Sequence, residues 1–312
     1  MGKASRIKNR EAAALAKAQK KEAKAAAKRA QAQFVERPFE GLDSELELVA
    51  MKEVLPAATL AVKLKAELPQ VEAYPELAEH GGEEVLLVTM LPQMVGALRR
   101  GDGVLMVAVQ AIASSGDASL DIADRIMASL ELEEGQTFTQ IDLPEQGAPR
   151  LQDILDPAGY GDFEVRNDLE FWVSEKERED PEVVAAIAAT KDRLIPMAEV
   201  AGVRGAFWAR LQREFVRWVR TDPEDAVLAA LARLQSRREL GWEGARFVGA
   251  FRACGLLIPV FELDRGTEAE ELETPMAEFA KVFEKEIASD APLTPEERRA
   301  KAGIISRQVT LR

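Results

Sequence analysis

Apolar residues recur with a helical spacing in several segments of the chain. Leu46, Val49 and Ala50 share one side of a predicted helix that runs from Ser44 to Leu55, with Asp43 or Ser44 as its cap and Pro56 as its end. The same spacing predicts further helices over residues 118–130, 181–193, 226–237 and 275–287, and a short one after Thr294. Six helices are therefore expected after residue 33.

Alternating or continuous apolar runs between these helices predict strands. Gly101-Asp-Gly103 and Cys254-Gly255 each join two such runs, and short glycine-containing connections are typical of hairpins. The expected strands cover residues 59–64, 84–91, 97–100, 104–110, 163–165, 171–173, 197–200, 205–211, 214–220, 247–252 and 256–263. Strands followed by helices, without strict alternation, indicate an α+β fold with largely antiparallel sheets and flanking helices.

These elements divide the chain into four parts. A basic arm covers residues 1–33, a first α+β unit 34–145, a second α+β unit 146–290, and a short C-terminal helix with a tail 291–312. Both units contain a hairpin, an apolar strand, an acidic helix cap and a leucine-rich helix in that order. This order is consistent with an internal duplication, although the two segments differ too much in sequence to prove one.

The arm differs from the rest of the chain in charge. It carries ten cationic and two acidic residues, a net charge of +8; since the 312-residue chain carries −13, the remainder carries −21. A cationic arm on an acidic body suggests that the arm has a polyanion as partner. The cations of the arm are Lys3, Arg6, Lys8, Arg10, Lys17, Lys20, Lys21, Lys24, Lys28 and Arg29.

Alanine, lysine, arginine, glutamine and glutamate dominate the arm from Asn9 to Gln33, and they are the best helix formers. Ile7 and Leu15 are its only sizeable apolar side chains, so it has no apolar stripe that could join a core. Three interpretations stay open for this basic, helical or disordered arm. It is a solvated tail, or it binds the phosphates of ribosomal or other RNA or of DNA, or it binds anionic lipid.

The rarest residues exclude several classes of protein. The chain has one histidine, His80, and one cysteine, Cys254, which rules out a disulfide framework and a Cys/His zinc site. One imidazole also makes a Ser-His-Asp or Cys-His catalytic system a poor fit. No apolar run approaches the ~20 residues of a membrane span. We therefore expect a soluble cytoplasmic protein with no catalytic residue, metal or cofactor that the sequence can identify.

The remaining polar motifs have ordinary structural interpretations. Asp117, Asp121 and Asp124 fall near the start of a predicted helix, where aspartate is favoured by the helix dipole more often than by a metal. Gly81-Gly82 and Gly101-Asp-Gly103 lack the spacing of phosphate-binding loops. His80 is expected in an exposed loop, and Cys254 is expected to be a buried, inert thiol. With 54 acidic residues, chance pairs of carboxylates are inevitable and none stands out.

A segment rich in arginine and aromatic residues lies between Lys191 and Arg252. One interpretation is a sheet with core aromatics and solvent-side arginines; the other is a surface for an extended peptide or single-stranded RNA. Strand alternation places Arg217 and Trp218 on opposite faces. We expect Trp218 in the core and Arg210, Arg213 and Arg217 in an accessible row that contacts protein. The cations of the segment are Lys191, Arg193, Arg204, Arg210, Arg213, Arg217, Arg220, Arg233, Arg237, Arg238, Arg246 and Arg252.

Several segments after residue 34 resemble an uncharacterised actinobacterial family, domain-of-unknown-function family 5926. They are residues 37–42 (Arg-Pro-Phe-Glu-Gly-Leu), 54–59, 150–156 (Arg-Leu-Gln-Asp-Ile-Leu-Asp), 171–173, 291–300 and 307–311. The resemblance implies an actinobacterial, cytoplasmic origin and supplies no catalytic residues. It also implies, ahead of this region, a zinc motif like the one that ends the SecA motor, which is associated with docking onto ribosomes or secretion chaperones. The arm has no cysteine or histidine, so that motif is absent here.

Two classes of function stay open at this point. The first is a non-enzymatic adaptor or chaperone-like factor, whose arm binds the ribosome or other RNA and whose body binds a client protein or peptide. The second is an enzyme of an unrecognised class that uses carboxylate and arginine side chains. The shortage of histidine and cysteine and the lack of a phosphate loop favour the adaptor.

Overall fold

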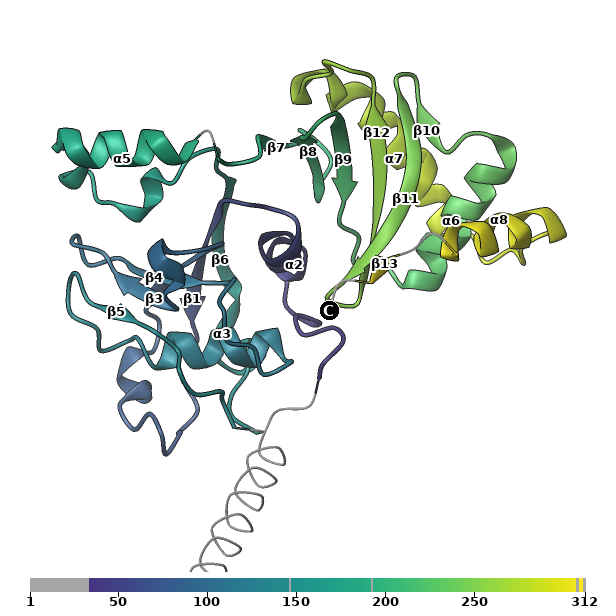
Figure 1. Cartoon of the computed structure of the whole chain (residues 1–312). Coiled ribbons are helices and arrows are strands. Elements are labelled where there is room, and N and C mark those ends of the chain that lie inside the picture. Colours follow the sequence, from purple (N-terminus) through teal and green to yellow (C-terminus); the bar gives the residue numbers. More distant parts are fainter. Residues whose placement is uncertain (1–33, 146, 192, 307–308, 311–312) are drawn as a thin grey trace, which may run out of the picture.

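The computed structural model describes residues 34–145, 147–191, 193–306 and 309–310. Two β-sheets lie on either side of helix α2 (Glu45–Glu53), as Figure 1 shows. Side chains of α2 share one apolar cluster with Leu60 and Val62 of the first sheet and with Phe207 and Ile258 of the second. The two sheets are therefore joined through a common core rather than by a linker alone.

The first sheet is mixed but mostly antiparallel. Strand β2 pairs antiparallel with β1 and parallel with β4. A hairpin joins β3 to β4 through the turn at Gly101-Asp-Gly103, as the sequence predicts. Its strand order is β5 (Thr137–Phe138), β3 (Ala97–Arg99), β4 (Leu105–Ala108), β2 (Glu84–Val88), β1 (Ala58–Leu64) and β6 (Leu155–Val165).

The second sheet is antiparallel along its main path, and the short strand β13 (Val309–Thr310) adds to β11 in parallel. The hairpin of β11 and β12 turns at Cys254-Gly255, as predicted. Its strand order is β10 (Gly241–Trp242), β11 (Ala245–Ala253), β12 (Leu256–Leu263), β9 (Glu214–Trp218), β8 (Ala206–Arg210) and β7 (Met197–Glu199). The largely antiparallel α+β fold is thus confirmed.

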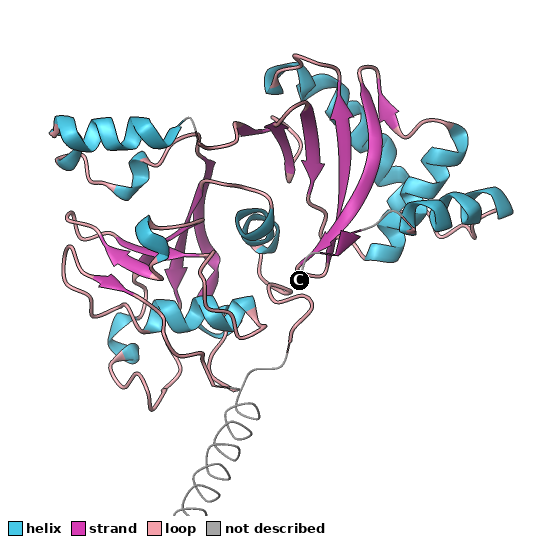
Figure 2. Cartoon of the chain, in the orientation of Figure 1, coloured by secondary structure: helices cyan, strands magenta, loops and turns pink. Residues whose placement is uncertain are grey.

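Helices flank both sheets (Figure 2). Helices α6 and α7 supply the apolar residues that cover one face of the second sheet, while α2 lies on its other face. Local chemistry fixes several helix starts: Asp117 accepts hydrogen bonds from two amides of α3, and Thr294 with Glu297 forms a capping box at α8. The further helices are α3 (Ala118–Met127), α4 (Leu151–Ile154), α5 (Pro181–Lys191), α6 (Glu224–Arg237), α7 (Glu273–Ile287) and α8 (Pro295–Ile305).

Two sequence-based assignments are corrected by the structure. Residues 171–173, expected as a strand, lie in and after a 3₁₀ helix over Glu170–Trp172, because Phe171 is buried and the Trp172 indole donates to the carbonyl oxygen of Met90 at 2.9 Å. Residues 163–165, expected in the second unit, are the end of β6 and pair with β1. Tertiary contacts of aromatic side chains, and not local alternation, decide both segments.

Candidate functional site

The ten cations of the arm all lie outside the described part of the chain. The described chain begins at Phe34, whose side chain is 66% exposed. The amide of Val35 donates to the carbonyl oxygen of Gly116 at 3.0 Å, so the segment that follows the arm is held against the first unit.

The three arginines of the expected contact row do not share one face of the second sheet. Arg210 is paired with Glu214 in the β8–β9 ladder, on the side where Trp208 and Val216 join the core under α6 and α7. Arg217 points the other way, toward α2, where its Nη1 lies 3.4 Å from the carbonyl oxygen of Val54. Burial there lowers the pKa of Arg217. The contact role of the row stays a prediction, but a single row does not form.

Ion pairs occupy much of this arginine-rich segment. Arg210 binds Glu214 at 3.2 Å and Glu268 at 2.6 Å, and Arg213 binds Glu262 at 2.6 Å. Among the described residues, seven of its twelve cations pair with a carboxylate in this way, namely Arg204, Arg210, Arg213, Arg220, Arg237, Arg246 and Arg252. Pairing of this kind neutralises the positive surface that a polyanion would need.

Trp218 is a core residue, as predicted, with 1% of its surface exposed. Its ring lies 5.0 Å from that of Phe283 and carries the Arg220 guanidinium at 4.5 Å on one face. Trp208 is buried as well, and its indole donates to the carbonyl oxygen of Thr267 at 2.9 Å. These aromatic residues therefore build the sheet–helix interface of the second unit.

The three aspartates near the start of α3 each have a local partner. Asp117 caps the helix, Asp121 accepts from the amide of Ser115 at 3.0 Å, and Asp124 accepts from the hydroxyl of Tyr74 at 2.8 Å. Burial raises the pKa of Asp121, although the hydrogen bonds from Ser115 oppose that shift. Among the residues that the structure describes, no group of His, Cys, Asp or Glu side chains is arranged to hold a metal ion.

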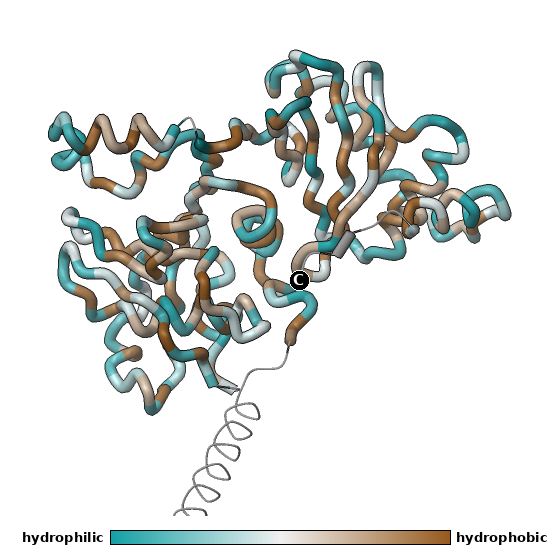
Figure 3. The backbone as a smooth tube through the Cα atoms, viewed as in Figure 1, coloured by the Kyte–Doolittle hydropathy of each residue, from teal (hydrophilic) through white to brown (hydrophobic). Residues whose placement is uncertain are grey.

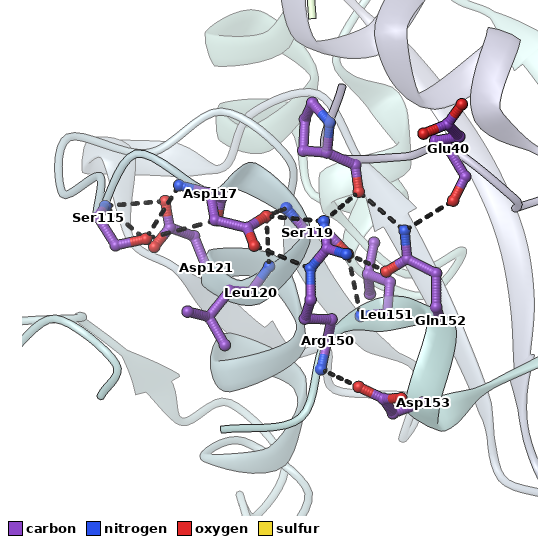
Figure 4. Close-up of polar contacts among 11 residues, drawn as sticks. Glu40, Ser115, Asp117, Ser119, Leu120, Asp121, Arg150, Leu151, Gln152 and Asp153 are labelled. Atoms are coloured by element: carbon purple, nitrogen blue, oxygen red, sulfur yellow. Dashed lines mark hydrogen bonds and ion pairs between the residues drawn. The ribbon is translucent and has the colours of Figure 1, made fainter. Parts of the chain in front are cut away.

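A polar network at the start of α3 clamps the segment that follows the arm (Figure 4). The Arg150 guanidinium donates to the carbonyl oxygen of Pro38 at 2.9 Å and pairs with Asp117 at 2.8 Å. The Gln152 amide donates to the carbonyl oxygens of Pro38 and Glu40. Two of the segments on which the family resemblance rests, residues 37–42 and 150–156, thus meet in this network.

His80 does not lie in an exposed loop, contrary to expectation, because it is half-buried at the end of the 3₁₀ helix Leu77–His80. Its Nδ1 lies 2.7 Å from Glu83 and its Nε2 lies 2.5 Å from Glu131. Burial alone lowers the pKa of His80, but hydrogen bonds and attraction to the two carboxylates outweigh it, so the pKa is raised. His80 therefore connects the segment before β2 to the segment after α3, and both of its ring nitrogens contact a carboxylate.

A cavity of about 910 Å³ lies between the start of the described chain, the end of α2, the start of α3 and the β11–β12 turn of the second sheet. This volume is within the range of sites that hold small molecules or peptide segments. Four separate parts of the fold form its wall. They are the entering segment (Phe34, Val35, Glu36, Pro38), the end of α2 (Lys52, Glu53), the loop before α3 with its first residue (Ser114, Gly116, Ala118), and the start of α6 with the end of β11 and the β11–β12 turn (Glu224, Arg252, Ala253, Cys254, Gly255).

Charged groups line this cavity without forming a catalytic pair. Arg252 makes a two-pronged ion pair with Glu224, one bond of which joins Nε to Oε2 at 2.8 Å. Burial raises the pKa of Glu53, although Lys52 opposes that shift. Burial also raises the pKa of the Cys254 thiol to about 12, which favours its protonated form at neutral pH. The residue is only half-buried, so the expectation of a buried thiol is met in part.

The turn that closes the cavity has a strict backbone requirement. Cys254 and Gly255 both adopt left-handed conformations, with φ of +47° and +75°. A Cβ atom at Gly255 would lie 2.7 Å from the Cβ of Arg37 and 3.0 Å from the carbonyl oxygen of Glu36. The turn therefore packs directly against the entering segment, and Gly255 permits this close approach.

The sequence gives no direct signal for the cavity. Its walls come from residues 34–38, 52–53, 114–118, 224 and 252–255. The sequence predicts the helices over 44–55 and 118–130 and the Cys254-Gly255 hairpin, but not that they meet around a cavity. No helix of the described residues is long and apolar enough to cross a membrane.

Comparison with known proteins finds a single match. No curated protein and no solved structure matches the chain. Residues 38–312 match a family described as "Family of unknown function (DUF5926)". The match covers both sheets, the network at the start of α3 and every part of the cavity wall except residues 34–36, so the chain belongs to the DUF5926 family.

Proposed function

We propose that the protein is a non-enzymatic cytoplasmic adaptor whose basic arm binds RNA, foremost that of the ribosome, and whose body binds a segment of a client protein. The separation of charge supports this proposal most strongly. The arm carries +8, while the rest of the chain carries −21 and uses many of its arginines in internal ion pairs. Contact with a polyanion is then confined to the arm.

The position of the cavity supports the second half of the proposal. Phe34, the first described residue after the arm, lies at its rim, so a client held there would be close to the point where the arm leaves the body. Exposed aromatic side chains beside a concave surface are favourable anchors for a protein partner. An adaptor of this design brings a client to RNA without catalysing a reaction.

The arm is tested by sedimentation of the full chain with purified ribosomes. Replacing Lys17, Lys20, Lys21 and Lys24 by Gln should abolish co-sedimentation. The matched control replaces four exposed lysines of the body, Lys63, Lys176, Lys191 and Lys285, and should bind like the parent. Affinity of the parent should fall by about 10³-fold or more between 50 and 200 mM salt if six or more phosphates are contacted. Salt-insensitive binding, or equal loss in both variants, would contradict the proposal.

An enzyme remains the second candidate because of one observation, the raised pKa of the Glu53 carboxyl group in the cavity wall. A carboxyl group with a raised pKa in a cavity of this size is a feature of acid–base sites. Native mass spectrometry of the purified full chain and of its Glu53→Gln variant separates the two functions. A small molecule retained by the parent and lost from the variant would favour the enzyme, and the adaptor predicts no such molecule.

A further inference from the structure

One face of the second sheet is only partly covered. Helices α6 and α7 pack on the opposite face, while α2 covers this one beside Phe207 and Ile258. Farther along the same face, Phe215 of β9 and Val260 of β12 are half-buried and belong to none of the apolar clusters that the described residues form. We call this area the outer face, and its residues are Arg213, Phe215, Arg217, Arg246, Val260 and Glu262.

The outer face carries more guanidinium groups than carboxylates. Arg213 and Arg246 share one carboxylate, that of Glu262, at 2.6 and 2.9 Å. With Arg217 the face therefore holds three cations and one anion, a net charge of 3 − 1 = +2, on a body that carries −21. The two outer arginines are accessible, since 52% of the Arg213 side chain and 72% of the Arg246 side chain are exposed.

Arg217, unlike these neighbours, has no carboxylate beside it. It is half-buried, and no ion pair joins it to an acidic side chain within the described part of the chain. Its hydrogen bond to the carbonyl oxygen of Val54 is long, at 3.4 Å, and uses one of the five N–H groups of the guanidinium. Burial of a cation without a counter-ion is costly, so a carboxylate brought by a partner would stabilise this side chain.

Helix α5 has a surface that complements the outer face. None of its residues is buried, Val184 is 51% exposed, and its main neighbour is the 3₁₀ helix Glu177–Glu179. Its start is acidic, with Asp180 before the first turn and Glu182 within it. One chain therefore presents an apolar helix with carboxylates at its start and an apolar sheet face with an excess of guanidinium groups.

We propose that the protein forms a two-fold dimer in which α5 of each copy packs on the outer face of the other and brings Glu182 to Arg217. This inference goes beyond the proposed function and does not rest on it. Two different surfaces of one chain close a dimer when each copy supplies both, and the same contact then forms twice. Helix α5 lies beside the first sheet and away from the second in Figure 1, which favours contact between copies over contact within one chain.

The dimensions of the two surfaces agree. An 11-residue helix is about 16 Å long, while the three adjacent strands β9, β12 and β11 extend about 10 Å between their outer axes. Helix α5 is therefore long enough to cross all three strands. Contact of Val184 with Phe215 and Val260 would remove apolar surface of both copies from water, and the charges at the start of α5 would neutralise those of the outer face.

Sedimentation velocity of the full chain at about 1 to 100 µM tests the dimer. The parent should form a dimer, and Arg217→Glu and Glu182→Arg should each weaken it by about 100-fold or more, because each reversed charge acts twice. The matched controls are Arg299→Glu and Glu296→Arg, both exposed on α8, which begins with Pro-Glu as α5 does. They should dimerise like the parent. A parent that stays monomeric at all concentrations would overturn the proposal.

Mixing the two charge-reversed variants tests which surfaces meet. In a dimer of one Arg217→Glu chain and one Glu182→Arg chain, one contact joins the two introduced charges and the other joins the two original ones. Opposite charges therefore face each other at both contacts, and an equimolar mixture should dimerise within about tenfold of the parent affinity. Absence of recovery in the mixture, or full dimerisation of either variant alone, would overturn the pairing of α5 with the outer face.

Two milder substitutions keep the proposal testable if Arg217→Glu unfolds the chain. Arg246→Glu changes an accessible side chain of the outer face and should weaken the dimer by about tenfold. Val184→Asp changes an exposed side chain of α5 and should abolish dimerisation without changing the circular dichroism of the chain. A dimer that persists in both variants, or oligomers that grow beyond two copies with concentration, would overturn the proposal.

These measurements use neither RNA nor a client, so they fail independently of the proposed function. Ribosome binding by a parent that remains monomeric would support the adaptor and overturn the dimer. A dimer that responds to the charge-reversed variants as expected, in a chain that does not bind ribosomes, would support the dimer and refute the adaptor.

Discussion

Helix α2 is rich in charged residues and is buried, whereas helix α5 is rich in apolar residues and is not buried. Four of the nine residues of α2 are charged, yet it lies between the two sheets, and even Glu45 and Glu47 are buried. Seven of the eleven residues of α5 are apolar, from Val183 to Ala189, yet none of its residues is buried. Figure 3 shows the run of hydrophobic residues along α5, which lies to one side of the first sheet, and the position of α2 between the two sheets.

The difference teaches that partners, and not hydrophobicity alone, decide which helix joins the core. The buried carboxylates of α2 are matched by arginines from elsewhere in the fold: Arg37 binds Glu45 at 2.6 Å and Arg204 binds Glu47 at 2.9 Å. A buried charge is tolerated when it is paired and hydrogen-bonded. Within the part of the chain that the structure describes, no sheet covers α5 and buries its alanines and valines.

The largest effect is expected from truncating the core side of α2. Leu48→Ala removes a fully buried side chain from the cluster shared by both sheets and should lower the free energy of unfolding by about 3 kcal/mol. Val184→Ala in α5, where the side chain is 51% exposed, should change it by no more than about 0.5 kcal/mol. Urea unfolding of both variants measures the contrast, and similar losses in the two helices would break the comparison.

The second effect concerns the buried charge. Arg37→Ala leaves the Glu45 carboxylate buried without its guanidinium and should cost about 2 kcal/mol. Adding Glu45→Gln should recover part of this loss, because an amide is cheaper to bury than a carboxylate. Glu40→Ala, which removes the exposed partner of Arg37 at 3.4 Å, is the control and should cost less than about 0.5 kcal/mol. If the effects of the two substitutions on the free energy of unfolding simply added in the double variant, the pairing of Arg37 with Glu45 would not contribute to stability.

A third, smaller effect tests how tightly the cavity turn packs on the entering segment. Gly255→Ala introduces a Cβ at a left-handed position and against the backbone of Glu36, and should cost about 2 kcal/mol or slightly less. Gly266→Ala has the same backbone strain, with φ of +89°, but meets nothing within 4 Å, and should cost about 1 kcal/mol. Thermal unfolding of both variants isolates the contact. Equal losses would mean that the turn can move away from Glu36.

The smallest expected effect is the pH dependence that His80, a paired titratable group, gives to the free energy of unfolding. Because the pKa of His80 is raised in the folded protein, its stabilisation is complete below about pH 6.5, the ordinary value of the unfolded chain, and is lost as pH rises through the folded-state pKa. The stability difference between the parent and His80→Gln should therefore shrink as the pH rises above about 6.5. A constant difference across this range, measured by urea unfolding, would show that the contacts with Glu83 and Glu131 do not depend on the imidazolium charge.

Much of the local structure could be predicted from the sequence alone. The Gly101-Asp-Gly103 and Cys254-Gly255 hairpins, the cap of α8 and the burial of Trp218 all follow from signals within a few residues. Turn geometry, capping and strand alternation act over such short distances, and neighbouring residues carry the information. The charge of the arm is likewise a property of the sequence itself.

The candidate site depended on contacts between distant residues. The division of Arg210 and Arg217 between two faces follows from strand register and from the position of α2, which no local pattern encodes. The partners of His80 lie 3 and 51 positions away, and the cavity brings together residues from 34 to 255. The sequence determined which segments become helices, turns and a charged arm, because those depend on short-range sterics and composition. Only the tertiary structure decided which charges are paired and where a cavity remains, because burial and pairing energies depend on what packs against each residue.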